Sequence, residues 1–292
     1  MPIEKIKSIN FPNWLKSFPF IVLHLACLSA LFVEFSWSLF YLCLGSYLVR
    51  MFGITAGYHR YFSHRAYKTT RWFQFVLAWL GCSALQKGPL WWASHHRDHH
   101  KYSDTPEDPH SPHRTSFWWS HVGWVLSNDH ADYPGNNIQD FSKYPELRFL
   151  SNYHWIPGIF LAVLCYLWMG FPGLVWGFFV STVLVYHCTF FINSLTHLVG
   201  VKRFETSDES RNSLILAILT MGEGWHNNHH HYQSSANQGF YWWEIDLSYY
   251  ILYGLSCFGI VWELRKPGEK ALNFRRRKPI RKKKKKLTKI SA

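Results

Sequence analysis

Histidine is the residue type whose number and spacing in this sequence could do chemistry. Residues 96–100 read His-Arg-Asp-His-His, and residues 226–230 repeat that spacing as His-Asn-Asn-His-His. Upstream, His59 and His64 are five positions apart. Histidine is the commonest metal ligand in proteins. Two copies of one spacing, together with a third histidine pair, therefore predict a metal site.

The geometry of a helix divides these side chains between metal ions. His96 and His100 share a helix face, whereas the neighbouring His99 and His100 point about 100° apart and can serve different ions. His197, at the end of an apolar stretch, adds a further candidate. Nine imidazoles are too many for one ion and enough for two. The nine candidate ligands are His59, His64, His96, His99, His100, His197, His226, His229 and His230.

Other uses of so many histidines fit less well. Structural zinc needs only four ligands and commonly uses cysteines, but the six cysteines here lie far apart without C-x-x-C spacing. No H-E-x-x-H protease motif occurs. Because imidazole binds iron, copper, zinc and nickel, ligand type alone leaves the metal open. The pattern favours a two-metal redox site, with a non-enzymatic metal-binding membrane protein as the weaker alternative.

Acidic residues beside the clusters are expected to orient the ligands. A metal-bound histidine commonly donates its second N–H to a carboxylate or carbonyl, which fixes its tautomer. The residues predicted for this role are Asp98, Asp104, Asp108 and Glu223. The histidines predicted not to bind metal are His24, His95, His110, His113, His121, His130, His154, His187 and His231.

The composition predicts a membrane protein with a substantial polar part. Hydrophobic residues make up 48% of the chain and aromatic residues 19%, whereas the mean hydropathy is only −0.13. Four apolar runs, each close to the roughly 20 residues of a membrane-spanning helix, cover residues 18–33, 36–56, 155–169 and 171–192. Residues 72–92 are predicted as one amphipathic or half-inserted helix that leads to His96.

Charge predicts the orientation of these helices. The connections near Glu34 and at residues 170–173 contain no Lys or Arg, so the positive-inside rule places both termini and all three histidine clusters in the cytoplasm. The predicted fold, over residues 1–274, is an all-α integral membrane protein. In it, four transmembrane helices carry a cytoplasmic helical cap that holds the two-metal site.

The formal net charge is +13, and many of the basic residues lie in residues 275–292. This segment is predicted to be a disordered tail, which anionic lipid attracts by about 1 kcal/mol per basic residue near the surface. The rest of the chain has no nucleic-acid-binding motif, so nucleic acid is not an expected partner.

Several stretches resemble the membrane fatty acid desaturases, and among these the Δ9 acyl-CoA (stearoyl-CoA-type) group. The similarity extends from about residue 18 to residue 265, and the order, spacing and membrane placement of the motifs all agree. The matching stretches are residues 53–60, 96–101, 108–110, 120–124, 193–197 and 222–230.

The resemblance implies an enzyme of unsaturated fatty acid biosynthesis with two iron ions. The nine candidate histidines would hold the iron, and Asn193 would contact one ion through a water. The family uses O2 and two electrons to insert a cis double bond into a saturated acyl chain. The electrons would come from a separate reductase with a small haem or iron–sulfur carrier. Gln86, Trp92 and Thr189 match the residues that kink the family's apolar substrate tunnel, which holds one bond of the chain against the irons.

The acyl carrier stays open. Animal acyl-CoA enzymes have an Arg-Asp pair where this chain has Ser94-His95, and a basic segment that residues 129–150 do not resemble. Residues 227–228 and 241–244 resemble bacterial members, some of which act on lipid-linked chains. The sequence therefore favours an acyl-CoA Δ9-desaturase, with an acyl-lipid desaturase or a related di-iron membrane hydroxylase as alternatives.

Overall fold

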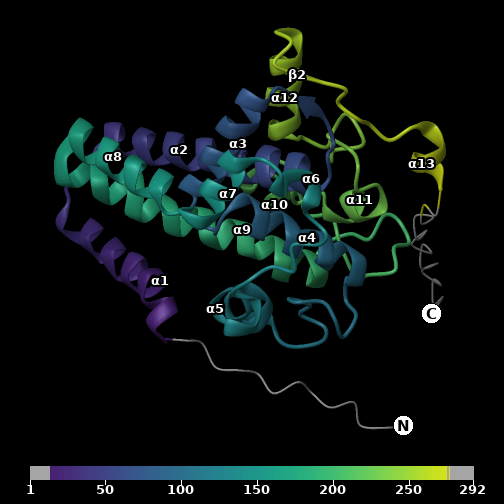
Figure 1. The fold of residues 1–292 in the computed structure, drawn as a ribbon, viewed down its shortest axis with the longest axis horizontal. Coiled ribbons are helices and arrows are strands. Elements are labelled where there is room, and N and C mark those ends of the chain that lie inside the picture. Colours follow the sequence, from purple (N-terminus) through teal and green to yellow (C-terminus); the bar gives the residue numbers. More distant parts are fainter. Residues whose placement is uncertain (1–13, 275, 277–292) are drawn as a thin grey trace, which may run out of the picture.

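The computed structural model describes residues 14–274 and residue 276, and these residues are mostly helical (Figure 1). The helical class predicted from the sequence is therefore correct. The described residues also contain one antiparallel pair of two-residue strands, β1 (Lys68–Thr69) and β2 (Val261–Trp262). The predicted basic tail lies outside the described residues, apart from residue 276.

Within the described residues, two helices are long and apolar enough to cross a membrane, Trp37–Ser63 and Ile156–Leu198. The first consists of α2 (Trp37–Phe52) and the wider helical segment η2 (Gly53–Ser63) that continues it. Ser36 caps α2, because its hydroxyl accepts the backbone N–H of Leu39 at 3.3 Å. The predicted first span is a shorter apolar helix, Ser17–Phe32, made of the end of α1 (Trp14–Ala26) and a 3-10 turn, η1 (Cys27–Phe32).

The second long segment is a helical hairpin. Its 43 residues would extend about 65 Å if straight, roughly twice the hydrocarbon thickness of a bilayer. Met169 and Gly170 leave the helical conformation, and Gly170 has φ +62°, which favours glycine. The chain then returns, so that η5 (Val175–Val180) packs against α8 (Ile156–Leu174) and leads into α9 (Ser181–Leu198). The turn predicted at residues 170–173 is thus present, and the four-span count stays a prediction.

The helix predicted over residues 72–92 is in fact two helices, α3 (Arg71–Ser83) and α4 (Pro89–Tyr102). Gly88 and Pro89 start α4, because proline fits the first helical turn, where no partner for its missing N–H is needed. Close packing holds α3 against η2. A Cβ atom on Gly81 would lie 2.2 Å from the ring of Tyr58, so a larger residue at position 81 would separate the two helices.

The shorter helices gather at the end of the long helices that lies away from the Gly170 turn (Figure 1). Their position on the cytoplasmic side stays a prediction. They are η3 (Trp119–Gly123), α5 (Trp124–Leu126), η4 (Asn128–His130), α6 (Gln139–Ser142), α7 (Pro145–Asn152), α10 (Leu214–Leu219), α11 (His226–His231), α12 (Leu247–Cys257) and α13 (Glu269–Asn273).

Candidate metal centre

The nine candidate histidines converge in two groups. The first group is His59, His64, His96, His100 and His229; the second is His99, His197, His226 and His230. Within each group, one nitrogen from every residue lies within 4.8 Å of the others. The neighbours His99 and His100 enter different groups, which agrees with their separation around the helix.

An unusual helix geometry aligns His59 with His64. The backbone N–H of His64 bonds the carbonyl of His59 at 3.2 Å, which is the i→i+5 pattern of a π-helix. In an α-helix, two residues five positions apart point about 140° apart around the axis. In this wider segment the same two residues are about one full turn apart, so they lie on nearly the same face. The side chains of His59 and His64 can therefore enter the same group because η2 is π-helical. His96 and His100 enter that group from one face of α4.

The Nε2 atoms of the first group follow one another at short range. The distances are 3.0 Å from His59 to His229, 2.8 Å from His229 to His100, 3.0 Å from His100 to His96 and 2.9 Å from His96 to His64. Imidazole nitrogens bound to one metal at about 2.1 Å and at right angles are roughly 3 Å apart. The observed separations fit ligands that face a common ion.

The second group contains buried nitrogens that need a partner. His230 Nδ1 lies 2.8 Å from a carboxylate oxygen of Asp208, whereas its Nε2 is buried without a hydrogen bond. His197 Nε2 lies 3.1 Å from His226 Nε2. A buried unsatisfied nitrogen costs about 1–3 kcal/mol. A cation among these lone pairs removes that cost, so both groups fit a metal ion.

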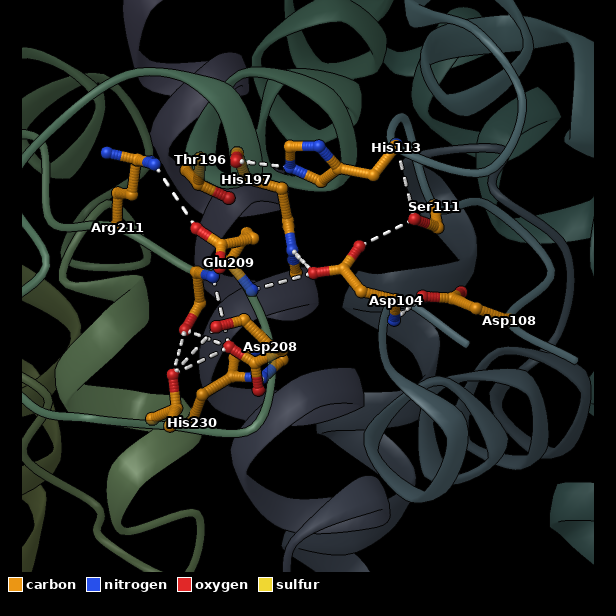
Figure 2. Close-up of polar contacts among 12 residues, drawn as sticks. Asp104, Asp108, Ser111, His113, Thr196, His197, Asp208, Glu209, Arg211 and His230 are labelled. Carbon is orange, nitrogen blue, oxygen red and sulfur yellow. Dashed lines mark hydrogen bonds and ion pairs between the residues drawn. The ribbon is translucent and has the colours of Figure 1, made fainter. Parts of the chain in front are cut away.

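Carboxylates contact the other ring nitrogen of several histidines. Three of these carboxylates belong to Asp104, Asp108 and Glu223, for which the sequence predicts a role in orienting ligands. His197 Nδ1 lies 3.0 Å from Asp104, which also accepts the hydroxyl of Ser111 at 2.6 Å (Figure 2). The remaining two contacts are 3.0 Å from His99 Nδ1 to Asp108 and 2.5 Å from His59 Nδ1 to Glu223. These bonds fix the tautomers that leave Nε2 free for metal.

Asp98 differs from the other predicted carboxylates. Its Oδ1 atom accepts a hydrogen bond from the side-chain amide of Asn137 at 2.9 Å. It follows His96 and His99 closely in the sequence, but on α4 it occupies another face of the helix. The predicted role of orienting a ligand is therefore not supported for Asp98.

Two residues that lie against the histidines have no signal in the sequence near the clusters. Asp208, on the segment between α9 and α10, bonds His230, and the amide of Gln238 lies 3.2 Å from His59 Nδ1. Figure 2 shows how Asp208 comes near Asp104: the backbone N–H of Glu209 donates to Asp104 at 2.8 Å. Asp208 is distant from the clusters in sequence, so adjacency gave no signal for it.

The electrostatics of the site favour ionised carboxylates and a neutral ring at His96, whereas the pKa of His99 is raised, because the lowering effect of burial is outweighed by the charge and hydrogen bond of Asp108. Burial by itself raises the pKa of Asp104 and Asp208, yet the hydrogen bonds and charge of His197 and His230 hold both well below the ordinary range. Burial, with the charge of neighbouring histidines, holds the pKa of His96 well below its usual value. Neutral imidazole is the form that binds metal.

A cavity of about 200 Å³, here called the main cavity, leads towards the histidines. Gln86, Trp92, Thr189 and Asn193 all line it, together with His96. A smaller inner cavity of about 30 Å³ shares four of these residues and extends to His59, His226 and Met51. The predicted kink residues therefore border the space between the opening and both histidine groups.

The histidines predicted not to bind metal lie outside the two groups. His95 Nδ1 bonds the carbonyl of Trp91 at 2.9 Å, and His231 Nε2 bonds that of Ala271 at 2.7 Å. His110 comes nearest, because its ring stacks on His99 at 4.2 Å and it forms a further cluster with His99 and Asp108.

Comparisons with known proteins agree with this site. The family model described as fatty acid desaturase matches residues 35–256. The chain is 41% identical to an acyl-CoA 5-desaturase of Anemone leveillei, over 85% of this chain and 78% of that protein. It is 38% identical to an sn-1 stearoyl-lipid 9-desaturase of Anabaena variabilis, over 85% of this chain and 92% of that protein. It is 39% identical to a chloroplastic palmitoyl-monogalactosyldiacylglycerol delta-7 desaturase of Arabidopsis thaliana, over 85% of this chain and 67% of that protein.

The match covers most of the chain and includes all nine candidate histidines. Members of this family are membrane-associated oxidoreductases that act on fatty acyl groups, and the two long apolar helices agree with that setting. The chain belongs to the fatty acid desaturase family.

Proposed function

We propose that this protein is an O2-dependent desaturase that inserts a cis double bond at Δ9 of a saturated long-chain acyl group. The observation that carries the proposal is the main cavity, which passes Gln86 and Thr189 and meets the histidine groups at His96 and Asn193. The Δ9 position is supported by two relatives described as sn-1 stearoyl-lipid 9-desaturases, at 38% and 39% identity.

We assign the two histidine groups to two iron ions, with Asn193 contacting one ion through a water. The iron pair, when bound, supplies the redox chemistry by which O2 takes two hydrogens from the acyl chain and, with two electrons and two protons, becomes water. The protein holds the ligand rings in one tautomer through Asp104, Asp108, Asp208 and Glu223. The buried position of six of the nine histidines limits the access of water; these are His59, His99, His197, His226, His229 and His230.

The residues around the cavity position the substrate. The amide of Gln86 donates to Thr189 Oγ1 at 3.1 Å, and the ring of Trp92 stacks on His96 at 4.9 Å. A chain that bends at this point presents one carbon–carbon bond to the histidine groups, which gives positional selectivity by proximity. Electrons come from an external reductase and a small haem or iron–sulfur protein. We place four spans in the membrane, with the active site on the cytoplasmic side.

The acyl carrier is a CoA thioester, as the resemblance implied, or a lipid ester. Charges at the opening favour the lipid. A neighbouring cavity of about 280 Å³, here called the opening, shares Lys87 and His154 with the main cavity. Lys87 and Asp132 are the charged residues, among the described ones, that line these two spaces. Burial, with the charge of Lys87, lowers the pKa of His154 at the same opening to about 4, so this ring is neutral. CoA phosphates would need several Arg or Lys partners.

A reconstituted enzyme distinguishes the two carriers. We expect protein in vesicles, with reductase and carrier, to desaturate isotope-labelled stearoyl chains of the vesicle lipid and to leave added stearoyl-CoA unchanged. The products are separated into lipid and CoA fractions before analysis. Conversion of stearoyl-CoA ahead of the lipid would contradict a lipid carrier and restore the acyl-CoA reading.

The proposed reaction is tested by the fatty acid profile of a desaturase-deficient host that expresses this chain. We expect a new monounsaturated acid whose double bond is cis and at Δ9 by mass spectrometry. A hydroxylated acid would instead favour the related di-iron hydroxylase. Absence of any product from folded, iron-loaded protein with a competent donor would contradict the proposed substrate class.

Removal of metal is expected to destabilise the protein. A ligand at about 100 times its Kd stabilises a fold by about 2.7 kcal/mol, so chelation is expected to lower the midpoint of thermal unfolding by about 5–10 °C. Tryptophan fluorescence of the purified protein in detergent measures the midpoint before chelation, after it and after iron is restored. An unchanged midpoint after complete iron removal would count against metal binding by both groups.

A further inference from the structure

The loop between α3 and α4 carries Gln86 into the main cavity on a strained backbone. Leu85 has φ +56° and Lys87 has φ +68°, both in the left-handed region that non-glycine residues seldom adopt. Each such residue costs about 1–3 kcal/mol and persists only where its surroundings hold it. The contacts that hold Leu85 and Lys87 therefore decide where Gln86 lies.

Two tyrosine hydroxyls hold the carbonyl groups on either side of Gln86. Tyr186 on α9 donates to the carbonyl of Leu85 at 3.1 Å. Tyr58 on η2 donates to the carbonyl of Lys87 at 3.0 Å, and its hydroxyl also contacts Cys82 Sγ at 3.0 Å. Both tyrosines are buried. The loop is thus fixed from two helices that approach it from different parts of the chain.

Helix α9 contacts the loop between α3 and α4 through a second residue, Thr189. Tyr186 and Thr189 are three residues apart and share a face of α9, and Thr189 accepts the amide of Gln86 at 3.1 Å. The ring of Tyr186 stacks on Phe20 at 5.5 Å and on Phe190 at 5.7 Å. These apolar contacts would hold the ring in place without its hydroxyl, so the hydroxyl bond can be removed separately.

We propose that Tyr186 and Tyr58 are positioning residues for regioselectivity. Their hydroxyls fix the backbone that carries Gln86, and Gln86 with Thr189 fixes the bend of the acyl chain in front of the histidine groups. The inference rests on the proposed desaturase function. Neither hydroxyl bonds a histidine of the two groups. Tyr186 also lines the main cavity, whereas Tyr58 does not, so an effect common to both hydroxyls acts through Gln86. Because a misplacement of about 1 Å has large effects on reaction at a chosen bond, loss of either hydroxyl spreads the reaction over neighbouring bonds.

The variant Tyr186→Phe tests this inference in the desaturase-deficient host. The readout is the ratio of double-bond positional isomers by mass spectrometry, measured together with protein amount and iron content. We expect the share of isomers next to the main position to rise about tenfold, while iron content stays that of the wild-type protein. Tyr166→Phe is the matched control, because Tyr166 lies on α8 with its side chain exposed; its isomer ratio is expected to stay unchanged.

The outcomes separate the inference from the proposed function. A Tyr186→Phe protein that makes less product at an unchanged isomer ratio would show a merely structural role and overturn the inference. Tyr58→Phe provides a second test at the other carbonyl, where the same spread of isomers is expected if Tyr186→Phe does not fold. Absence of product from the wild-type protein would overturn the proposed function itself, and this inference with it.

Discussion

Replacement of His229 by alanine is expected to reduce the unsaturated product below detection and to release iron from the first histidine group. His229 Nε2 lies 3.0 Å from His59 Nε2 and 2.8 Å from His100 Nε2, so it links the ring from η2 with the ring from α4. Loss of the His229 ring removes the nitrogen that lies between those of His59 and His100. The measurements are the host's fatty acid profile and the iron content of the purified protein.

His231→Ala is the matched control for this variant. His231 lies two residues further along α11, stacks on Phe204 with ring centroids 4.0 Å apart, and bonds the carbonyl of Ala271. Its removal is expected to lower stability without loss of iron or product. Full iron content and normal product from His229→Ala would contradict the assignment of the first group.

Replacement of Asp208 by asparagine is expected to weaken iron binding by the second group 10- to 100-fold, which is about the usual effect of losing a carboxylate behind a metal-bound histidine. The Asp208 carboxylate accepts from His230 Nδ1 at 2.8 Å and thereby leaves Nε2 as the free, buried nitrogen. Competition with a chelator of known affinity measures the loss, and activity is expected to fall in parallel.

Asp98→Asn provides the comparison for Asp208. Both changes remove one negative charge near the histidines, but Asp98 bonds Asn137. We expect iron affinity within about twofold of the wild-type value for Asp98→Asn, because the half-buried Asp98 bonds Asn137 and not a histidine of the two groups. Equal losses from both variants would mean that charge in general, and not the bond to His230, holds the iron.

The histidine pattern could be predicted because its signal is local. The spacing of His96, His99 and His100 on one helix already separates them between two groups, and the family resemblance adds His197 and the order of the motifs. The carboxylates Asp104 and Asp108 were found because they follow their cluster within a few residues.

The remaining parts of the site depend on tertiary structure. Asp208 and Gln238 reach the histidines only after distant segments pack together, and nothing in their sequence neighbourhood marks them. The apolar pattern of residues 72–92 is interrupted at Gln86, Lys87, Gly88 and Pro89. A single helix is nevertheless predicted there because the pattern continues on both sides, although Gly88 and Pro89 give the signal for a helix start. The π-helical form of residues 53–63 likewise had no pattern of its own.

The four carboxylates behind the histidines have a consequence for the charge balance of the centre. Asp104, Asp108, Asp208 and Glu223 supply four negative charges, and the imidazoles supply none. The buried Arg60 lies 2.9 Å from Asp246 and 3.0 Å from Glu223, and the charge of Asp246 offsets that of Arg60.

These charges equal those of two divalent ions, and two trivalent ions would leave an excess of two positive charges. Such an excess is costly in a buried site, where the effective dielectric constant is low. With the proposed iron pair bound, this arrangement would stabilise its divalent state and so raise its reduction potential. We expect electrons from an external donor to flow to this centre readily, and the resting protein to retain divalent iron once it has been reduced.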